Sequence, residues 1–283
     1  MKATIAIVAL IAAVTGCMTS QAATETATVA PPPYPAPATP QPAATPTPAA
    51  IPAPAAATPS TMAMPAEGKG MAGMAMANSD PDHIIADGGV KVAGWMGRVD
   101  PRAETQGRKI TEASFVSMGS GMHVTAGPAA IYWNAANSPS GNYTVKATFN
   151  QTKASTHPEG YGLIAAGRDL TTPNQSYAYF LVRQDGKYLI NHRAGDSTVH
   201  KIVDWTANPA VKAVDASGKA SNTLAIRVDA TNAHFMINGT EVHSMPRGTL
   251  EMGSTSPSNA GIAGIRVNHN LDVHIDGFGV TTN

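Results

Sequence analysis

The sequence predicts an all-β fold, a two-sheet antiparallel jelly-roll sandwich, that follows a tether without regular structure. Three observations support this prediction. Residues 80–283 contain short segments in which apolar and polar residues alternate, and a period of two is typical of half-buried strands. Clusters of glycine, asparagine, aspartate and proline separate these segments, as they do at turns. No window of the sequence carries a helical apolar stripe longer than two turns.

The strands and two of their turns can be placed individually. The clearest alternation occurs in residues 143–150, 224–229 and 271–276. The dipeptides Asp185-Gly186 and Asn238-Gly239 each stand between two such segments. Both predict β-hairpins, because the two central residues of a type I′ turn need positive φ angles. Repeated short strands over about 200 residues favour a sandwich or jelly roll.

The N-terminus predicts export and lipid attachment. Lys2 precedes an uncharged apolar run, residues 5–14, which is too short to span a membrane. Residues 1–16 resemble a bacterial lipoprotein signal peptide, which implies cleavage before Cys17 and acylation of its thiol, with palmitate among the expected chains. Met18 in place of aspartate implies delivery to the outer membrane of the cell envelope. The alternative is a secreted protein with an unpaired cysteine.

Residues 17–79 predict a disordered linker. Twelve prolines lie between Pro31 and Pro59, among alanine and threonine, and such a composition buries too little apolar surface to fold. The linker ends in a methionine-rich stretch that precedes Asp80, Asp82 and His83. Thioethers suit Cu(I), so copper binding is an alternative to simple flexibility. The methionines of this stretch are Met62, Met64, Met71, Met74 and Met76.

Charge and cysteine content exclude several classes of protein. Lysine plus arginine and aspartate plus glutamate both number 19, so the net charge is zero. No basic excess points to nucleic acid, and no charge block points to anionic lipid. Cys17 is the only cysteine, so the sandwich rests on its hydrophobic core rather than on disulfides. The lipid bilayer is therefore expected as a partner only through acylated Cys17.

A series of motifs between residues 157 and 280 carries a family resemblance. They read HPEGYGLI at 157–164, GRDL at 167–170, YFLVR at 179–183, NTLAIRV at 222–228, FMING at 235–239, GIRV at 264–267 and DGFGV at 276–280. Together they resemble the concanavalin A-like jelly rolls of laminin-G and glucanase type. Within these, the chain is most similar to the bacterial domain family named for 3-keto-disaccharide hydrolases. The resemblance implies a carbohydrate ligand and allows a hydrolase or lyase activity.

Sugar recognition uses aromatic platforms and planar polar groups, and alternation suggests where they lie. Tyr177, Tyr179 and Arg183 share one face of their predicted strand. In the next strand His192 lies opposite Arg193, and the sequence leaves open which of the two joins Arg183. The alternatives are arginines that cover a sheet edge and tryptophans that belong to the core. The candidate ligand-binding residues are Tyr179, Arg183, His192, Arg193, Trp205 and Trp133.

Acid–base chemistry has one candidate pair, His157 and Glu159, which precede a predicted strand near Arg168-Asp169. The alternative is a solvated loop in which the glutamate pairs with an arginine. The chain lacks the E-x-D-x-E pattern of a retaining glucanase, so nothing supports a glycosidase carboxylate pair. No cofactor or metal site is predicted. Calcium remains an alternative, with Asp169, Asn174, Asp196 and Asp215 as possible sources of ligands.

These observations favour an envelope lipoprotein, anchored in the membrane, whose β-sandwich binds carbohydrate or another cell-envelope ligand. A hydrolase or lyase that acts on (3-keto-)disaccharides is the first alternative, and it rests on the family resemblance. A protein–protein adhesion module is the second alternative, because jelly-roll folds host lectins, enzymes and adhesion modules alike.

Overall fold

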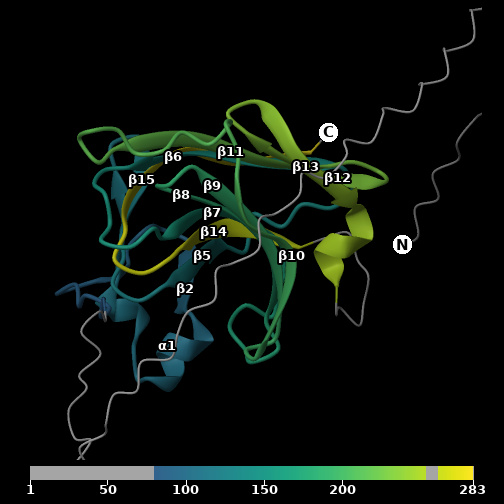
Figure 1. Ribbon diagram of the computed structural model, residues 1–283. Helices are drawn as coiled ribbons and strands as arrows, with labels where there is room; N and C mark the ends of the chain where they lie inside the picture. The colour runs from purple at the N-terminus through teal and green to yellow at the C-terminus, as the bar shows by residue number, and fades with distance from the viewer. Residues whose placement is uncertain (1–79, 253–260, 283) are drawn as a thin grey trace, which may run out of the picture. The chain divides into compact units, whose positions relative to one another are not determined.

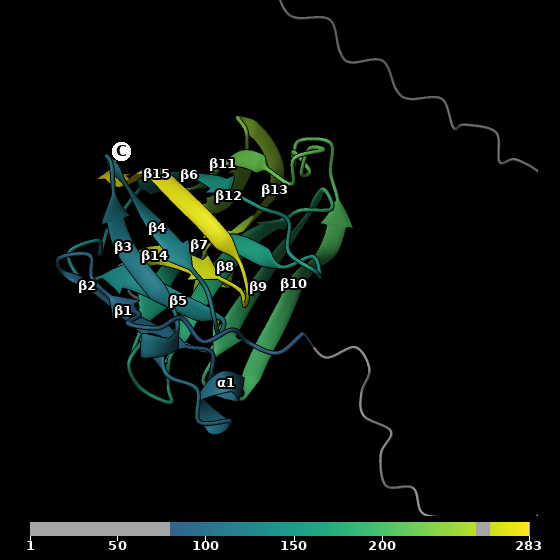
Figure 2. The same cartoon turned by 90° about the vertical axis from the view of Figure 1, so that its left-hand side faces the viewer.

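Two β-sheets form the folded part of the chain. The computed structural model describes residues 80–252 and 261–282. One sheet has eight strands, of which β1 and β3 are parallel and all other neighbours antiparallel. In spatial order they are β1 (Gly89–Val90), β3 (Ser114–Met118), β4 (Gly121–Thr125), β15 (Asp272–Thr282), β6 (Tyr143–Gln151), β11 (Ala220–Val228), β12 (Asn232–Ile237) and β13 (Thr240–Pro246). Figure 2 shows β3, β4 and β15 side by side in this sheet.

The second sheet has seven antiparallel strands and lies below the first in Figure 1. In spatial order they are β10 (Thr198–Ala207), β9 (Lys187–Ala194), β8 (Ser176–Arg183), β7 (Gly160–Arg168), β14 (Ile262–Val267), β5 (Ala130–Asn134) and β2 (Trp95–Val99). The described helices are short. They are α1 (Pro101–Thr105) and the 3₁₀ turns η1 (Ile110–Glu112) and η2 (Arg247–Glu251).

The predicted alternation is confirmed in β6, the strand that pairs with both β11 and β15. Tyr143, Val145, Ala147 and Phe149 are buried, and every residue between them is at least partly exposed. The same pattern holds in β11 and in the first half of β15. The predicted all-β class and the two-sheet jelly-roll sandwich are therefore confirmed.

The hydrophobic core fills the space between the two sheets. Its aromatic rings come from both layers: Phe180 of β8 meets Phe235 of β12 edge-to-face, with ring centroids 5.3 Å apart. Phe149 of β6 and Tyr161 of β7 also meet across the layers, with ring centroids 5.8 Å apart and the rings tilted by 37°. Aromatic pairs in this arrangement add to the stabilisation from apolar burial, so the sandwich holds together without covalent cross-links between its layers.

Both predicted hairpins are present, but their turns differ. Asn238 and Gly239, between β12 and β13, both have positive φ angles (51° and 85°), as a type I′ turn requires. In the β8–β9 hairpin Arg183 pairs with Lys187, so three residues form the loop, and of these only Gly186 has a positive φ. The expectation of a type I′ turn at Asp185-Gly186 is therefore wrong. A three-residue loop ending in glycine serves instead.

Several predictions fall outside the described residues. They concern the signal peptide, Cys17, the proline-rich linker and the methionine cluster. Among the helices in the described ranges, none is both long and apolar enough to cross a membrane.

Asn238 tests how strongly this turn supports the sheet. Its side-chain oxygen accepts a hydrogen bond from the Thr223 backbone N–H (2.9 Å), and its amide donates to the Ala210 carbonyl (2.8 Å) and to fully buried Asn222 (2.9 Å). We expect Asn238→Ala to lower the free energy of unfolding by about 3 kcal/mol. The substitution removes these hydrogen bonds, and alanine has no polar side chain that would stabilise the left-handed backbone conformation of this position.

Urea unfolding followed by tryptophan fluorescence measures this change. The control is Asn174→Ala, because Asn174 is exposed and its side chain makes no hydrogen bond to the described residues. Equal midpoints for the two variants would contradict the role given to Asn238.

Candidate functional site

The outer face of the seven-stranded sheet, turned away from the eight-stranded sheet, carries a second buried cluster. We call it the aromatic face. Its apolar members come from β5, β7, β8 and β9 and from the start of the β7–β8 loop, and Trp205 of β10 packs against them. They are Ile131, Trp133, Ile164, Leu170, Tyr177, Tyr179, Leu181 and Leu189.

The outer face of the eight-stranded sheet has a different character. Thr148 and Thr223 hydrogen-bond across two strands at 2.8 Å, and Asn150 donates to Asp276 at 2.9 Å. These are paired polar groups of a solvent-facing surface. The seven-stranded sheet instead buries apolar and aromatic side chains on both faces. A two-sheet sandwich needs only the inner face of each sheet to be apolar, so the apolar outer face of this sheet calls for a separate explanation.

Five of the six predicted ligand-binding residues lie on the aromatic face. Trp133 comes from β5, Tyr179 and Arg183 from β8, Arg193 from β9 and Trp205 from β10. The pairing of β8 with β9 decides which side of β9 faces the two tyrosines, a point that the sequence left open. Tyr177 pairs with Arg193, and Tyr179 pairs with Asn191, so Arg193 and Asn191 share the face of the two tyrosines.

His192 is the exception and requires a correction. It points to the opposite side of β9, has no exposed surface, and its Nε2 lies 3.2 Å from the Ser176 hydroxyl. Burial, followed by the nearby His200, lowers the pKa of His192 to about 4. The expected groove of Arg183, His192 and Arg193 therefore does not form. His192 and Arg193 are consecutive residues of β9, so their side chains point to opposite faces of the sheet, and only Arg193 shares the face of Arg183.

Trp205 closes one end of the aromatic face. Its ring lies 4.4 Å from the Arg183 guanidinium carbon, and Arg183 also binds the Asp185 carboxylate at 2.7 Å. A Cβ atom on Gly160 would come within 2.9 Å of the indole. The glycine thus makes room for the tryptophan, which packs onto the sheet and is only partly exposed.

Tyr179 lies between two polar side chains that keep unused hydrogen-bonding capacity. The Asn191 amide donates to the Tyr179 hydroxyl at 3.1 Å, and the Arg266 guanidinium carbon lies 5.1 Å from the Tyr179 ring centroid. Asn191 Oδ1 and Arg266 Nε are buried and have no hydrogen-bond partner within the described residues. Such groups cost free energy unless a partner satisfies them.

An ion cluster fixes the two buried arginines of this face. The Asp100 carboxylate binds Arg193 at 2.9 Å through one oxygen and Arg266 through the other. The Tyr177 hydroxyl accepts hydrogen bonds from both guanidinium groups, at 3.1 and 3.2 Å. Burial alone would raise the pKa of Asp100, but the charges of Arg266 and Arg193 outweigh it and hold the pKa below its usual value.

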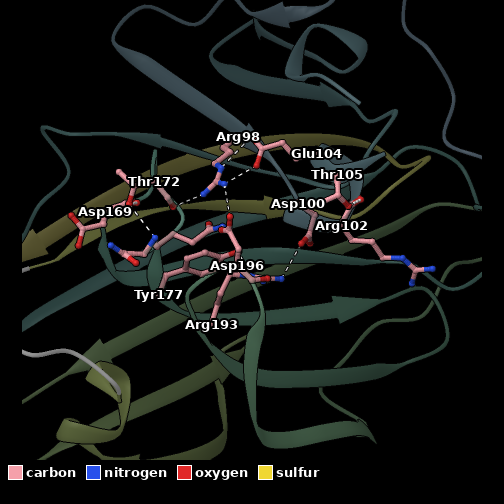
Figure 3. Close-up of polar contacts among 12 residues, drawn as sticks. Arg98, Asp100, Arg102, Glu104, Thr105, Asp169, Thr172, Tyr177, Arg193 and Asp196 are labelled. Carbon is pink, nitrogen blue, oxygen red and sulfur yellow. Dashed lines mark hydrogen bonds and ion pairs between the residues drawn. The ribbon is translucent and has the colours of Figure 1, made fainter. Parts of the chain in front are cut away.

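A second layer of charge joins this cluster to α1 and to the β9–β10 turn (Figure 3). Arg98 of β2 binds Glu104 of α1 at 2.7 Å and Asp196 at 3.0 Å, and it donates to the Thr172 carbonyl at 2.6 Å. The other Asp196 oxygen accepts from Gln175 at 2.6 Å. Helix α1 and two loops therefore meet around one guanidinium at the edge of the aromatic face.

The predicted acid–base pair is separated. His157 is exposed, and no hydrogen bond or ion pair between described residues joins its side chain to Glu159. Glu159 instead contacts His269 Nε2 at 2.8 Å, and His269 Nδ1 contacts Asp82 at 3.1 Å. The hydrogen bond to Glu159 raises the pKa of His269 despite partial burial. Both ring nitrogens are thus engaged by carboxylates.

Two of the four possible calcium ligands have their carboxylates engaged within the protein. Asp196 is bound to Arg98 and Gln175, and Asp215 accepts from the Ser217 and Lys219 backbone amides at 2.8 and 3.0 Å. Across residues 80–252 and 261–282, no group of three or more histidine, cysteine, aspartate or glutamate side chains is placed to hold a metal.

Comparisons with known proteins bear on the fold. The sequence matches no protein-family model and no curated protein. Among solved structures it is similar to the carbohydrate-binding module CBM66 from Bacillus subtilis, at 10% identity and a TM-score of 0.46, over 70% of this chain and 99% of that one.

Two further similar structures are a protein of unknown function with a galectin-like fold from Bacillus subtilis and sheep galectin-11. The first has 14% identity and a TM-score of 0.46, over 66% of this chain and 89% of that one. The second has 13% identity and a TM-score of 0.38, over 58% and 100%. Such values concern at most the arrangement of strands, so the ligand has to be argued from this chain's own residues.

The Asp100 cluster can be tested through stability. We expect Asp100→Asn to lower the free energy of unfolding by about 3–5 kcal/mol, because it leaves two buried guanidinium groups without their carboxylate. Urea unfolding measures the loss. The control is Asp204→Asn, whose ion pair with Lys201 is largely exposed (65% and 69%), so its loss should leave the urea midpoint almost unchanged. A small effect at Asp100 would mean that the arginines are neutralised elsewhere.

His192 predicts a pH dependence. Its folded pKa of about 4 lies below the value of 6.5 for an unperturbed histidine, so between these values the unfolded state binds the proton and the folded state does not. Stability is therefore complete above pH 6.5 and falls as the pH is lowered towards 4. The loss is of the order of 3 kcal/mol.

The His192→Gln variant lacks this titration, so its free energy of unfolding should fall less over the same range. Urea midpoints at several pH values measure the difference. His157→Gln, at an exposed position, should keep the wild-type slope, and equal slopes for all three proteins would refute the assignment.

Proposed function

We propose that this protein is a lipid-anchored envelope protein whose β-sandwich binds carbohydrate on the aromatic face of the seven-stranded sheet. The observation that carries the proposal is the composition of that face. Trp133, Tyr177 and Tyr179 are buried among Asn191, Arg193 and Arg266, on the side of the sheet where a sandwich ordinarily has a layer of solvent-facing polar side chains.

The chemistry of these groups suits a sugar. Pyranose rings have apolar C–H faces and a rim of hydroxyl groups, and aromatic rings with planar amide and guanidinium groups complement both. Asn191 Oδ1 needs a donor, and Arg266 Nε needs an acceptor. A hydroxyl group is both, so neighbouring hydroxyls of one sugar satisfy both atoms. The Arg193 guanidinium is held in place by Asp100 and Tyr177. The face therefore has little side-chain freedom to lose when a ligand binds.

The anchor belongs to the proposal as well. Residues 1–17 carry the features of a lipoprotein signal, and two or more acyl chains hold a protein firmly to a bilayer. The proline-rich linker then serves as a spacer between the membrane and the sandwich. Localisation at the outer membrane of a bacterial envelope is the corresponding expectation.

A hydrolase acting on 3-keto-disaccharides is the second candidate. The contact between Glu159 and His269 is the observation in its favour, because it pairs a carboxylate with a histidine of raised pKa. The carboxylates on both nitrogens of His269 weigh against proton transfer to a substrate. Binding without turnover is therefore the first candidate.

Ligand-observed NMR of the purified protein with glucose, galactose, N-acetylglucosamine and their disaccharides, 3-keto forms included, tests the proposal. We expect broadening of the ligand signals by the wild type. Asn191→Leu should weaken binding about tenfold or more, because it removes the polar group that meets the sugar. Its stability should change little, since an unsatisfied buried oxygen is removed as well.

The matched control is Asn150→Leu, at an asparagine on the outer face of the other sheet. It should bind sugars like the wild type. New product signals that grow with time would replace the binding proposal with the hydrolase. Equal binding by both variants would move the ligand away from the aromatic face, and no broadening with any sugar would refute carbohydrate binding.

A further inference from the structure

A cavity of about 620 Å³ lies beside the aromatic face and shares Asp100 with it. Residues before β1 form one wall, including Asp80. Another wall is formed by α1, including Arg102, and by Gln106, which follows the helix. The lining also includes Arg108, Ala129, just before β5, and His269, just after β14. The volume falls in the range of about 300–1,000 Å³ that is typical of small-molecule sites.

The charged groups of this cavity are largely neutralised by one another. Asp100 is bound to Arg193 and Arg266, and His269 is held between Asp82 and Glu159. Their charges therefore compensate one another largely within the walls of the cavity. The two lining charges without an ion pair among the described residues, Asp80 and Arg102, have opposite signs, so the cavity has no excess charge that would select an ion of one sign.

Three groups at the cavity keep free hydrogen-bonding capacity, and they are of both kinds. Asp80 Oδ2 is buried and has no hydrogen-bond partner within the described chain. The side chains of Arg102 and Gln106 make no hydrogen bond to any described residue, and Figure 3 shows Arg102 pointing away from the ion cluster around Asp196. An unpaired acceptor therefore faces the same space as unpaired donors, as a polyhydroxylated ligand requires.

The position of Asp100 connects this cavity to the aromatic face. Its carboxylate lines the cavity and also binds Arg193 and Arg266 of the face. Arg102 lines this cavity and a second one of about 550 Å³, which lies between α1 and the β9–β10 turn at Asp196. Binding groups thus continue from the sheet, past Asp100, into the larger cavity.

We propose that the 620 Å³ cavity is a second saccharide subsite, so that the ligand is an oligosaccharide and not a single sugar. One sugar unit lies on the aromatic face, and the next occupies the cavity with its hydroxyls on Asp80, Arg102 and Gln106. The inference rests on the proposed carbohydrate binding, which it extends from a chemical class to a minimum chain length.

Isothermal titration calorimetry of the purified full-length protein tests the subsite. The probes are N-acetylglucosamine, its β-1,4-linked dimer and trimer, and glucose, cellobiose and cellotriose. The variants are Ala129→Leu, which fills the cavity, and Arg102→Ala, which removes an exposed donor and leaves the core intact. The matched control is Arg227→Ala, at an exposed arginine on the outer face of β11.

We expect the wild type and Arg227→Ala to bind a dimer or trimer about tenfold or more tightly than the matching monomer. Both cavity variants should lose that gain and keep the wild-type affinity for the monomer. Arg102→Ala decides the matter if Ala129→Leu fails to fold.

Affinity that does not rise with chain length, or a rise that survives in Arg102→Ala, would overturn the subsite. Monomer binding that is still lost in Asn191→Leu would then leave the proposed function standing. No binding of any probe by the wild type would overturn the subsite together with the proposed function.

Discussion

Two arginine side chains are buried on the aromatic face of the seven-stranded sheet, and the single carboxylate of Asp100 is bound to both. An unpaired ion at this depth costs several kcal/mol, so Arg193 and Arg266 can occupy their positions only with that carboxylate in place. Asp100 also begins α1, because Pro101 follows it and the Glu104 amide bonds to its carbonyl. One residue therefore fixes the charge of the face and the place of the helix at its edge.

This arrangement makes the two outer surfaces of the sandwich unequal. The outer face of the eight-stranded sheet carries threonine, asparagine and aspartate side chains that are hydrogen-bonded to one another and face the solvent. The seven-stranded sheet has a second apolar cluster where such a layer would lie. The core between the sheets does not include these side chains, since Trp133, Tyr177 and Tyr179 belong to the second cluster.

The sequence predicted the strands well because their information is local. Alternation in residues 143–149 sets which side chains turn inwards, and Asn238-Gly239 sets a turn through its own backbone preference. The site was predicted in part for the same reason: Tyr179 and Arg183 share a face by period two. Whether Arg193 or His192 joins them depends on the number of residues in the β8–β9 loop. The sequence predicted a two-residue turn where the loop has three residues, so it could not decide which of the two side chains lies on that face.

The contributions of Asp100, Arg266 and His269 were missed because they arise from long-range contacts. Asp100 and Arg266 are 166 positions apart, and Glu159 and His269 are 110 apart. No local pattern marks an aspartate before a short helix as the partner of two distant arginines. One signal was available: Arg266 stands within the apolar strand Ile265-Arg266-Val267, and a charged residue in such a strand needs a buried partner.

The ion cluster also limits what the aromatic face can recognise. Asp100 and Tyr177 bind two of the three guanidinium nitrogens of Arg193 and two of the three of Arg266, so a carboxylate or phosphate would compete with an internal ion pair to bind there. Among the described residues, Oδ1 of Asn191 and Nε of Arg266 have no hydrogen-bond partner, and both side chains contact Tyr179. A neutral group that donates and accepts at once fits this pair, and it leaves the cluster undisturbed. The constraint that keeps the arginines buried thus also favours hydroxyl groups over anions as the ligand of the face.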